Sequence, residues 1–217
     1  MANNTIITIA RQYGSGGHDI GEKLAEELKI PFYDKELLER AAKDSGFCQE
    51  IFENYDEKPT NSFLYSLVMD TYSMGHSTAA FAEMPLNHKI FLAQFNAIKD
   101  IAKEGPCVIV GRCADYALAD FPNVVNVYLY ADMQSRIARI ARRHDVTDAK
   151  AKDLIQKTDK GRASYYNYYT NKKWGEATGY DLCLNTASLG IDGSIHMIRE
   201  FVAYKEREHE RIWQAAE

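Results

Sequence analysis

Residues 5–28 read TIITIARQYGSGGHDIGEKLAEEL, with three glycines among positions 14–17. The β-branched residues before these glycines predict a short buried strand. The residues after them place Ile20, Leu24 and Leu28 on one face, which predicts an amphipathic helix. Glycine lets the backbone turn with positive φ and approach a ligand closely, and a helix N-terminus attracts anions. This succession favours a phosphate-binding loop over a strand-to-helix turn that binds nothing.

The loop departs from the P-loop pattern G-x-x-x-x-G-K-[ST] at three positions, one of which is His18 at the place of the final serine or threonine. Arg11 stands where the pattern begins with glycine, and Gly17 stands where it has the lysine that bridges the outer phosphates. We hypothesise that Arg11 replaces the missing charge and that Asp19 holds Mg²⁺ through its carboxylate. The predicted donor-binding residues are Gly14, Ser15, Gly16, Gly17, His18 and Asp19.

The composition suits one globular domain, or one core with an inserted smaller lobe, because 46% of the 217 residues are hydrophobic. A formal net charge of −5 argues against general nucleic-acid binding. The four cysteines form no C-x-x-C pair, which indicates a reducing compartment without disulfides or structural zinc. The sequence shows neither a signal peptide nor an apolar stretch of about 20 residues, so we expect a cytoplasmic protein that does not bind membranes.

Strand and helix patterns alternate along the chain. Continuous or β-branched apolar segments at 107–110, 124–130 and 180–185 predict further strands, and amphipathic segments lie between them. This alternation predicts an α/β fold, a parallel sheet with helices on both faces.

Two polar residues follow predicted strands. Asp34 comes after the extended segment 30–33 and is either the N-cap of the next helix or a site residue beside the phosphate loop. Gly111 and Arg112 come directly after the strand at 107–110. The planar fork of an arginine can bind phosphate oxygens bidentately, so we favour a substrate-binding role for Arg112 over a surface ion pair.

A second set of arginines lies on predicted helices. Arg136, Arg139 and Arg143 share one face of the helix that Asp132 caps. Arg162 shares a face with Tyr165, Tyr166 and Tyr169, and these tyrosines either stack on a base or pack, packing being favoured for at least two. A solvated basic face is the usual explanation for such a run, but the chain is acidic overall, which makes the concentration of arginines less expected by chance.

Two other regions stand apart from the alternating pattern. The stretch from residue 46 onward is rich in aromatic residues and methionines without a clean strand, which predicts short helices and loops that grip a second substrate or simply pack. At the other end, KEREHERIWQAAE is typical of a solvated helix end. Ile212 and Trp213 favour the alternative that two copies of the chain associate through this helix as a homo-oligomer.

The order of these features resembles the cytidylate kinase-like proteins, a branch of the P-loop nucleoside monophosphate kinases. The similar segments are ARQYGSGGHDIGEKLAEEL, PFYDKELLERAA, GPCVIVGRCADYAL, NVYLYADMQSRIARIARR, DKGRASYYNYYTNKKWG and YDLCLNT. The resemblance implies a single P-loop kinase-like domain over 1–217, with an inserted helical monophosphate-binding lobe at 46–104 and a helical lid at 145–175.

The resemblance also implies roles for single residues. Gly14 to Gly17 would surround the donor phosphates, and Asp34 would lie near the acceptor and metal. Gly111-Arg112 resembles a G-R-D signature whose arginine faces the acceptor, with Cys113 at the place of the aspartate. Arg139, Arg143 and Arg162 resemble lid arginines that close on the transferred phosphate. With Arg112, and with Arg11 as the hypothesised replacement for the lysine, they are the candidate catalytic residues.

The leading hypothesis is therefore phosphoryl transfer from ATP and Mg²⁺ to a nucleoside monophosphate, CMP- or dCMP-like, or to a similar small phosphorylated acceptor. Loss of the lysine motivates an alternative, a nucleotide-binding pseudokinase that binds without turnover. A dinucleotide-dependent oxidoreductase is disfavoured, because Asp19 stands where the fingerprint G-x-G-x-x-G needs glycine.

Overall fold

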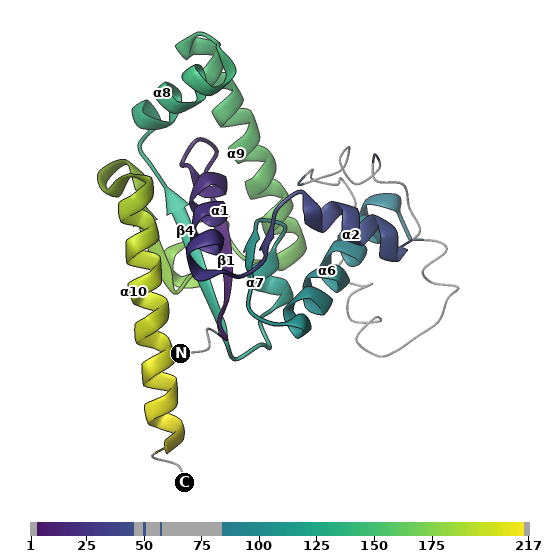
Figure 1. Cartoon of the computed structure of the whole chain (residues 1–217). Coiled ribbons are helices and arrows are strands. Elements are labelled where there is room, and N and C mark those ends of the chain that lie inside the picture. Colours follow the sequence, from purple (N-terminus) through teal and green to yellow (C-terminus); the bar gives the residue numbers. More distant parts are fainter. Residues whose placement is uncertain (1–3, 46–49, 51–56, 58–83, 215–217) are drawn as a thin grey trace.

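The structure, a computed structural model, describes residues 4–45, 50, 57 and 84–214 (Figure 1). Its centre is a five-stranded sheet in the order β2-β3-β1-β4-β5, and every neighbouring pair is parallel. The strands are β1 (Ile6–Arg11), β2 (Phe32–Tyr33), β3 (Val108–Val110), β4 (Val124–Tyr130) and β5 (Leu182–Asn185). The predicted α/β fold with a parallel sheet is confirmed.

Helices cover the sheet and extend beyond it (Figure 1). They are α1 (Gly17–Leu28), α2 (Glu36–Ser45), α6 (Leu86–Glu104), α7 (Ala114–Ala117), α8 (Met133–His144), α9 (Asp148–Thr170) and α10 (Thr186–Gln214), with a 3₁₀ turn at Ala177–Gly179. The predicted cap of α8 is confirmed, because the Asp132 side chain accepts a hydrogen bond from Ser135 N. No helix in the described ranges is long and apolar enough to cross a membrane.

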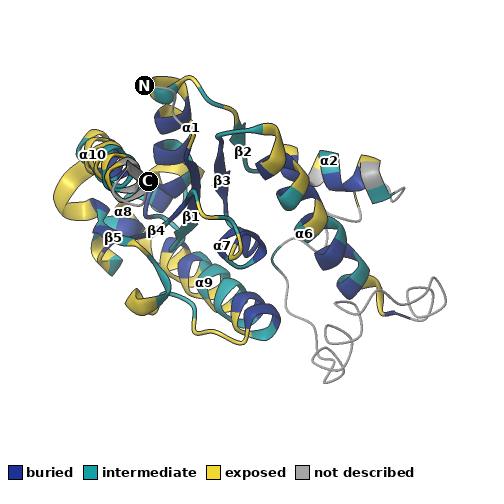
Figure 2. Ribbon diagram, turned by 90° about the horizontal axis from the view of Figure 1, so that it is seen from below, coloured by how far each residue is buried: buried dark blue, intermediate teal, exposed yellow. Residues whose placement is uncertain are grey.

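The two faces of the sheet carry separate hydrophobic clusters, as the alternating side chains of a strand require. Ile7 and Ile9 pack with residues of α1 and α10, whereas Ile6 and Ile109 pack with residues of α2, α6 and α7. Figure 2 shows the strands buried between these helices. This double cover fixes β1 at the centre and places the loop after it at the carboxyl edge of the sheet.

Helix α9 is anchored by aromatic packing against α6. The rings of Phe91 and Tyr169 stack with centroids 4.0 Å apart and planes 6° apart. Tyr165, Tyr166 and Tyr169 are all buried. The preferred interpretation of these tyrosines as packing residues is thereby confirmed.

Helix α10 begins at Thr186, directly after β5, and Gly190, with φ of 68°, interrupts it. Of the predicted lobe at 46–104, residues 46–49, 51–56 and 58–83 lie outside the described residues. The lobe and the lid at 145–175, which contains α9, stay predictions.

Candidate functional site: a phosphate loop facing an arginine cluster

The loop between β1 and α1 has the geometry of an anion-binding turn. Gly14 and Gly16 have φ of 82° and 87°, which side-chain-bearing residues rarely adopt. The loop opens onto a pocket of about 450 Å³. This pocket is lined by Gly14, Gly16, Gly17 and His18 of the predicted loop, and by Arg11, Asp34, Arg139, Arg143 and Arg162. Most of the predicted site residues therefore meet at one pocket.

Ser15 lies on the inner side of the loop. Its side chain is fully buried, and its Oγ has no hydrogen-bond partner among the residues that the structure describes. Its carbonyl oxygen accepts a hydrogen bond of 2.7 Å from the Thr186 hydroxyl, at the start of α10. This hydrogen bond anchors the loop to the edge of the sheet on the side away from the pocket, so the opposite side of the loop faces the pocket.

The side chain of Arg11 leaves no room for a side chain at position 17. A Cβ added to Gly17 would lie 2.7 Å from Arg11 Cβ and 2.8 Å from Arg11 Cγ, closer than real Cβ contacts. In the standard P-loop pattern the two positions hold glycine and lysine, so glycine leaves room for the lysine. In this chain the cationic residue and the glycine have exchanged positions, and the positive charge comes from Arg11 at the end of β1. This arrangement supports the hypothesis that Arg11 replaces the lysine.

A Gly17→Ala variant is expected to be less stable by about 1–3 kcal/mol, because its methyl group would overlap the fixed stem of Arg11. Urea unfolding of the full chain measures the difference. Gly179→Ala is the matched control, since a Cβ there meets no atom within 4 Å. Equal stability of Gly17→Ala and the unmodified protein would contradict the exclusion.

Arg112 and Asp34 form a buried ion pair beside the loop. The Arg112 side chain is 2% exposed, and its Nη1 donates to Asp34 Oδ1 at 2.8 Å. His18 Nδ1 lies 2.7 Å from the other oxygen, Asp34 Oδ2. Helix α2 begins only at Glu36, so the structure favours the site interpretation of Asp34 over that of an N-cap.

The backbone at Arg112 is unusual. Gly111, Arg112 and Cys113 have φ of 80°, 54° and 56°, three consecutive left-handed residues. The left-handed conformation costs conformational free energy in residues other than glycine. It is found mostly at functional sites, where the surrounding structure holds it in place. This turn directs the Arg112 guanidinium back toward Asp34 and the carbonyl of Val110.

The pairing of Asp34 with Arg112 can be tested by measuring the stability of the protein at acid pH. Burial raises the pKa of Asp34, but the charges of Arg112 and Arg11 outweigh burial and bring it below its ordinary value of 3.8. The ionised carboxylate therefore stabilises the fold above that value, and the contribution is lost as the pH falls through the folded-state pKa.

An Asp34→Asn variant is expected to lose about 2 kcal/mol at pH 7, where the charged hydrogen bonds are intact, and this deficit should shrink as the pH falls through the folded-state pKa of Asp34. Denaturant unfolding across this pH range measures the difference, with the exposed Asp120→Asn as control. A deficit that stays constant with pH would contradict the assignment.

Glu57 accepts hydrogen bonds from three separate parts of the fold, close to Arg112. Its Oε1 accepts from Arg11 Nη1 at 2.6 Å and from the Arg112 backbone N–H at 3.3 Å, and its Oε2 accepts from Arg162 Nε at 2.9 Å. Burial raises the pKa of Glu57, but the charges of Arg11, Arg162 and Arg112 lower it far below its usual range. Glu57 is therefore a carboxylate that bridges two catalytic candidates, Arg11 and Arg162.

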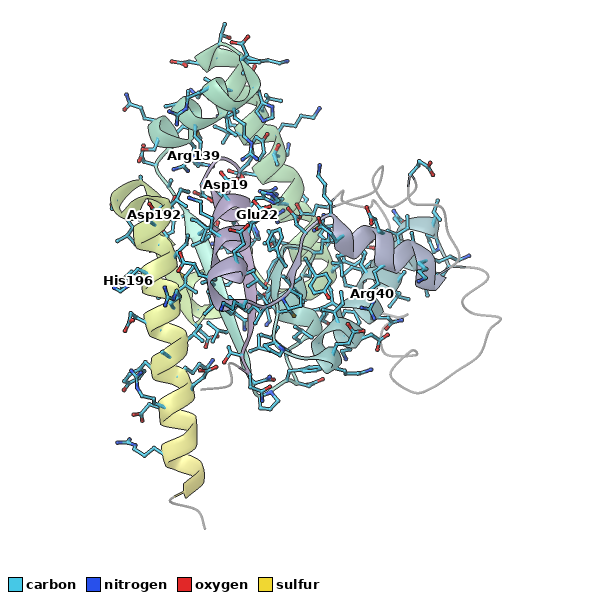
Figure 3. The ribbon with its side chains drawn as sticks, in the orientation of Figure 1. Asp19, Glu22, Arg40, Arg139, Asp192 and His196 are labelled. Atoms are coloured by element: carbon cyan, nitrogen blue, oxygen red, sulfur yellow. The ribbon has the colours of Figure 1, made fainter. Side chains whose placement is uncertain are left out.

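Helices α8 and α9 contact the phosphate loop directly. Arg139 Nη1 donates to the carbonyl of Gly14 at 2.6 Å, and Arg143 Nη1 lies 3.1 Å from Asp19 Oδ1. Figure 3 shows Arg139 above Asp19 and the start of α1. Asp159 accepts from the Tyr13 backbone N–H at 2.7 Å and pairs with Arg136. The predicted arginine face is therefore turned toward the loop.

An inner cavity behind Arg112 holds a second carboxyl group. Asp115 lines it with Cys113 and Tyr166, and the Tyr166 hydroxyl donates to Asp115 Oδ2 at 2.6 Å. Burial raises the pKa of Asp115. The carboxyl group that the G-R-D signature would have at position 113 is thus present two residues later.

A magnesium ion fits these residues only in the presence of phosphates. Among the residues that the structure describes, no three His, Cys, Asp or Glu side chains form a metal-binding group. Mg²⁺ is commonly held by one or two carboxylates, waters and substrate phosphates, which needs no such group. Asp19, at the first turn of α1, and Asp34, at the pocket, are the predicted carboxylates, and in the structure they pair with Arg143 and Arg112 respectively.

Sequence reasoning missed Glu57 and Asp159. Glu57 lies in a stretch whose aromatic composition dominated the interpretation, and no motif marks it. Asp159 had a signal, because it lies three residues before Arg162 and therefore on the same helical face.

Comparisons with known proteins show similarity in sequence and in fold. Residues 6–188 match the cytidylate kinase-like family. A cytidylate kinase from Ignicoccus hospitalis is 23% identical over 199 residues, which cover 91% of this chain and 99% of the relative. An uncharacterized protein from Eubacterium ventriosum has a solved structure that is 30% identical, with a TM-score of 0.69, covering 92% of this chain and 98% of that one. A shikimate kinase from Bacteroides thetaiotaomicron, 16% identical over 92% of this chain and 98% of that one, shares the fold with a TM-score of 0.53.

Proposed function

Because the chain belongs to the cytidylate kinase-like family, we propose that it transfers a phosphoryl group from ATP to a nucleoside monophosphate, CMP- or dCMP-like, or to a similar small phosphorylated acceptor. The observation that carries the proposal is the pocket at which the phosphate loop, Asp34, Arg11, Arg139 and Arg162 meet. Phosphoryl transfer needs two phosphates held in line, their charge neutralised and water excluded, and little covalent chemistry.

The donor side of the pocket is the loop with the N-terminus of α1. Backbone N–H groups and the positive end of the helix would bind the outer phosphates of ATP. Arg11 would supply the charge that lysine supplies elsewhere, and Arg139 and Arg143 would approach the same phosphates from α8. When bound with ATP, Mg²⁺ would neutralise phosphate charge, with Asp19 as the proposed carboxylate and Asp34 near its waters or the acceptor.

The acceptor side is the strand edge at Arg112. Its buried guanidinium is held in place by Asp34 and by the Val110 carbonyl, so it can bind an acceptor phosphate without first losing much side-chain entropy. Arg162 of α9 faces the same region through Glu57. The acceptor phosphate is already ionised at pH 7, so this chemistry does not demand a general base.

A phosphoryl-transfer panel tests the proposal. Full-length protein with ATP and Mg²⁺ is offered CMP, dCMP, UMP, AMP or GMP, and ADP formation is compared with a blank that lacks an acceptor. Acceptor-dependent ADP at enzyme-like rates is expected, with CMP or dCMP among the best acceptors. Absence of turnover with every acceptor, while ATP binds, would refute transfer to these nucleoside monophosphates and favour the binding module or an acceptor outside the nucleotides.

That alternative is a nucleotide-binding module without turnover. Gly17 at the lysine position is the observation that favours it. It differs from the leading proposal in a measurable way, because it predicts that ATP binds but that no phosphoryl group is transferred to any acceptor. Such a module would serve a regulatory role, sensing a nucleotide or holding a partner.

A further inference from the structure

Glu57 is bound in the way that proteins bind a phosphate group. Its two carboxylate oxygens receive hydrogen bonds from two guanidinium groups and one backbone N–H. These donors come from the end of β1, from the turn after β3 and from α9. Arginine forks and backbone N–H groups are the usual donors for both carboxylate and phosphate oxygens.

The position of this carboxylate lies between the two parts of the proposed site. Arg11 and Arg162 line the pocket at the phosphate loop and also line the inner cavity, which contains Glu57, Arg112 and Asp115. The side chains of Arg11 and Glu57 are only 11% and 15% exposed. An anionic group that enters from the loop pocket toward Arg112 therefore meets a cluster in which Glu57 already neutralises part of the arginine charge.

Gly111 adds an independent observation. A Cβ at this position would overlap both the Arg11 guanidinium and the Glu57 carboxylate, and Gly111 has φ of 80°. A side chain at position 111 would therefore displace the Arg11 guanidinium or the Glu57 carboxylate from its place.

We propose that the Glu57 carboxylate occupies the subsite of the acceptor's phosphate, and that a phosphate monoester binds there by displacing it. The inference rests on the proposed function for the class of ligand, but it concerns binding and requires no turnover. Glu57 then acts as an intramolecular competitor that keeps Arg11 and Arg162 together and offsets part of their positive charge when the acceptor is absent. If Glu57 fills the subsite 90–99% of the time, the apparent affinity for the anion falls by about 10- to 100-fold.

Calorimetric titration of the full chain with inorganic phosphate, without ATP, tests the proposal. Glu57→Gln removes the competing charge and is expected to bind phosphate about 10- to 100-fold more tightly than the unmodified protein. Glu104→Gln, which removes a surface glutamate paired with Arg40, is the matched control and is expected to change nothing. The double variant Glu57→Gln/Arg162→Gln should lose the gain, which assigns it to the arginines that Glu57 contacts.

A folded Glu57→Gln variant with unchanged or weaker phosphate binding would overturn the proposal and make Glu57 a purely structural partner. If Glu57→Gln does not fold, the Arg162 Nε–H resonance of the unmodified protein gives the answer by NMR. It should move during the phosphate titration, and a resonance that stays fixed at saturation would overturn the proposal. Failure of the acceptor panel leaves this result standing, and failure of this test leaves phosphoryl transfer standing.

Discussion

Replacement of Arg112 by alanine is expected to lower kcat/KM for the acceptor by about 10²- to 10³-fold, the usual effect of removing one preorganised charge-stabilising donor. The guanidinium is buried and aimed by Asp34, so its loss removes a positioned contact and also leaves Asp34 with only its His18 contact among those described above. Steady-state rates with varied acceptor at saturating ATP measure the loss. The KM for ATP should change little.

Two further variants make this result specific. Arg40→Ala removes an arginine whose partner, Glu104, lies on the surface, and it is expected to keep the unmodified kcat/KM. Arg112→Lys keeps a charge but not the planar fork, so it should recover only part of the activity. An Arg112→Ala variant with the full kcat/KM would remove Arg112 from the acceptor site.

Replacement of Arg11 by glycine is expected to lower kcat by about 10²- to 10³-fold, because no other residue in the loop supplies the missing lysine charge. The same substitution removes the Cβ and Cγ atoms that exclude a side chain at position 17. The double variant Arg11→Gly/Gly17→Lys restores both the glycine and the lysine of the P-loop pattern. It should therefore regain part of the activity that Arg11→Gly loses.

The single variant Gly17→Lys completes the cycle. With Arg11 present, the lysine stem has no space, so this variant should be both less stable and less active than the double variant. A double-mutant cycle on kcat measures the coupling between the two positions. Full turnover of Arg11→Gly would show that the cation is not needed, and additive losses would show that the two positions do not share one space.

The sheet and the phosphate loop could be predicted because their signals are local. The apolar segments 6–9 and 107–110 follow the rules for buried parallel strands, and the glycines at 14, 16 and 17 mark a turn whose φ values the structure confirms at two positions. The arginine face of α8 follows from helical spacing alone. Each of these features is determined by residues that lie close together in the sequence.

The contacts that organise the site could not be predicted, because they join residues far apart in the chain. Asp34 meets Arg112 across 78 positions, and Glu57 meets Arg162 across 105. Only the strand order decides that these segments share an edge. The exclusion between Arg11 and Gly17 likewise depends on where the stem of Arg11 lies in three dimensions.

The hydrogen bonds between the α8–α9 pair and the loop backbone make one amide proton a reporter of helix movement. The Tyr13 N–H is held by Asp159 of α9, while Arg139 of α8 and Arg162 of α9 hold the neighbouring carbonyls of Gly14 and Arg11. Separation of α9 from the loop exposes that proton to solvent. Its exchange with deuterium therefore records how often the helices leave the loop, and a nucleotide that bridges the two should slow it.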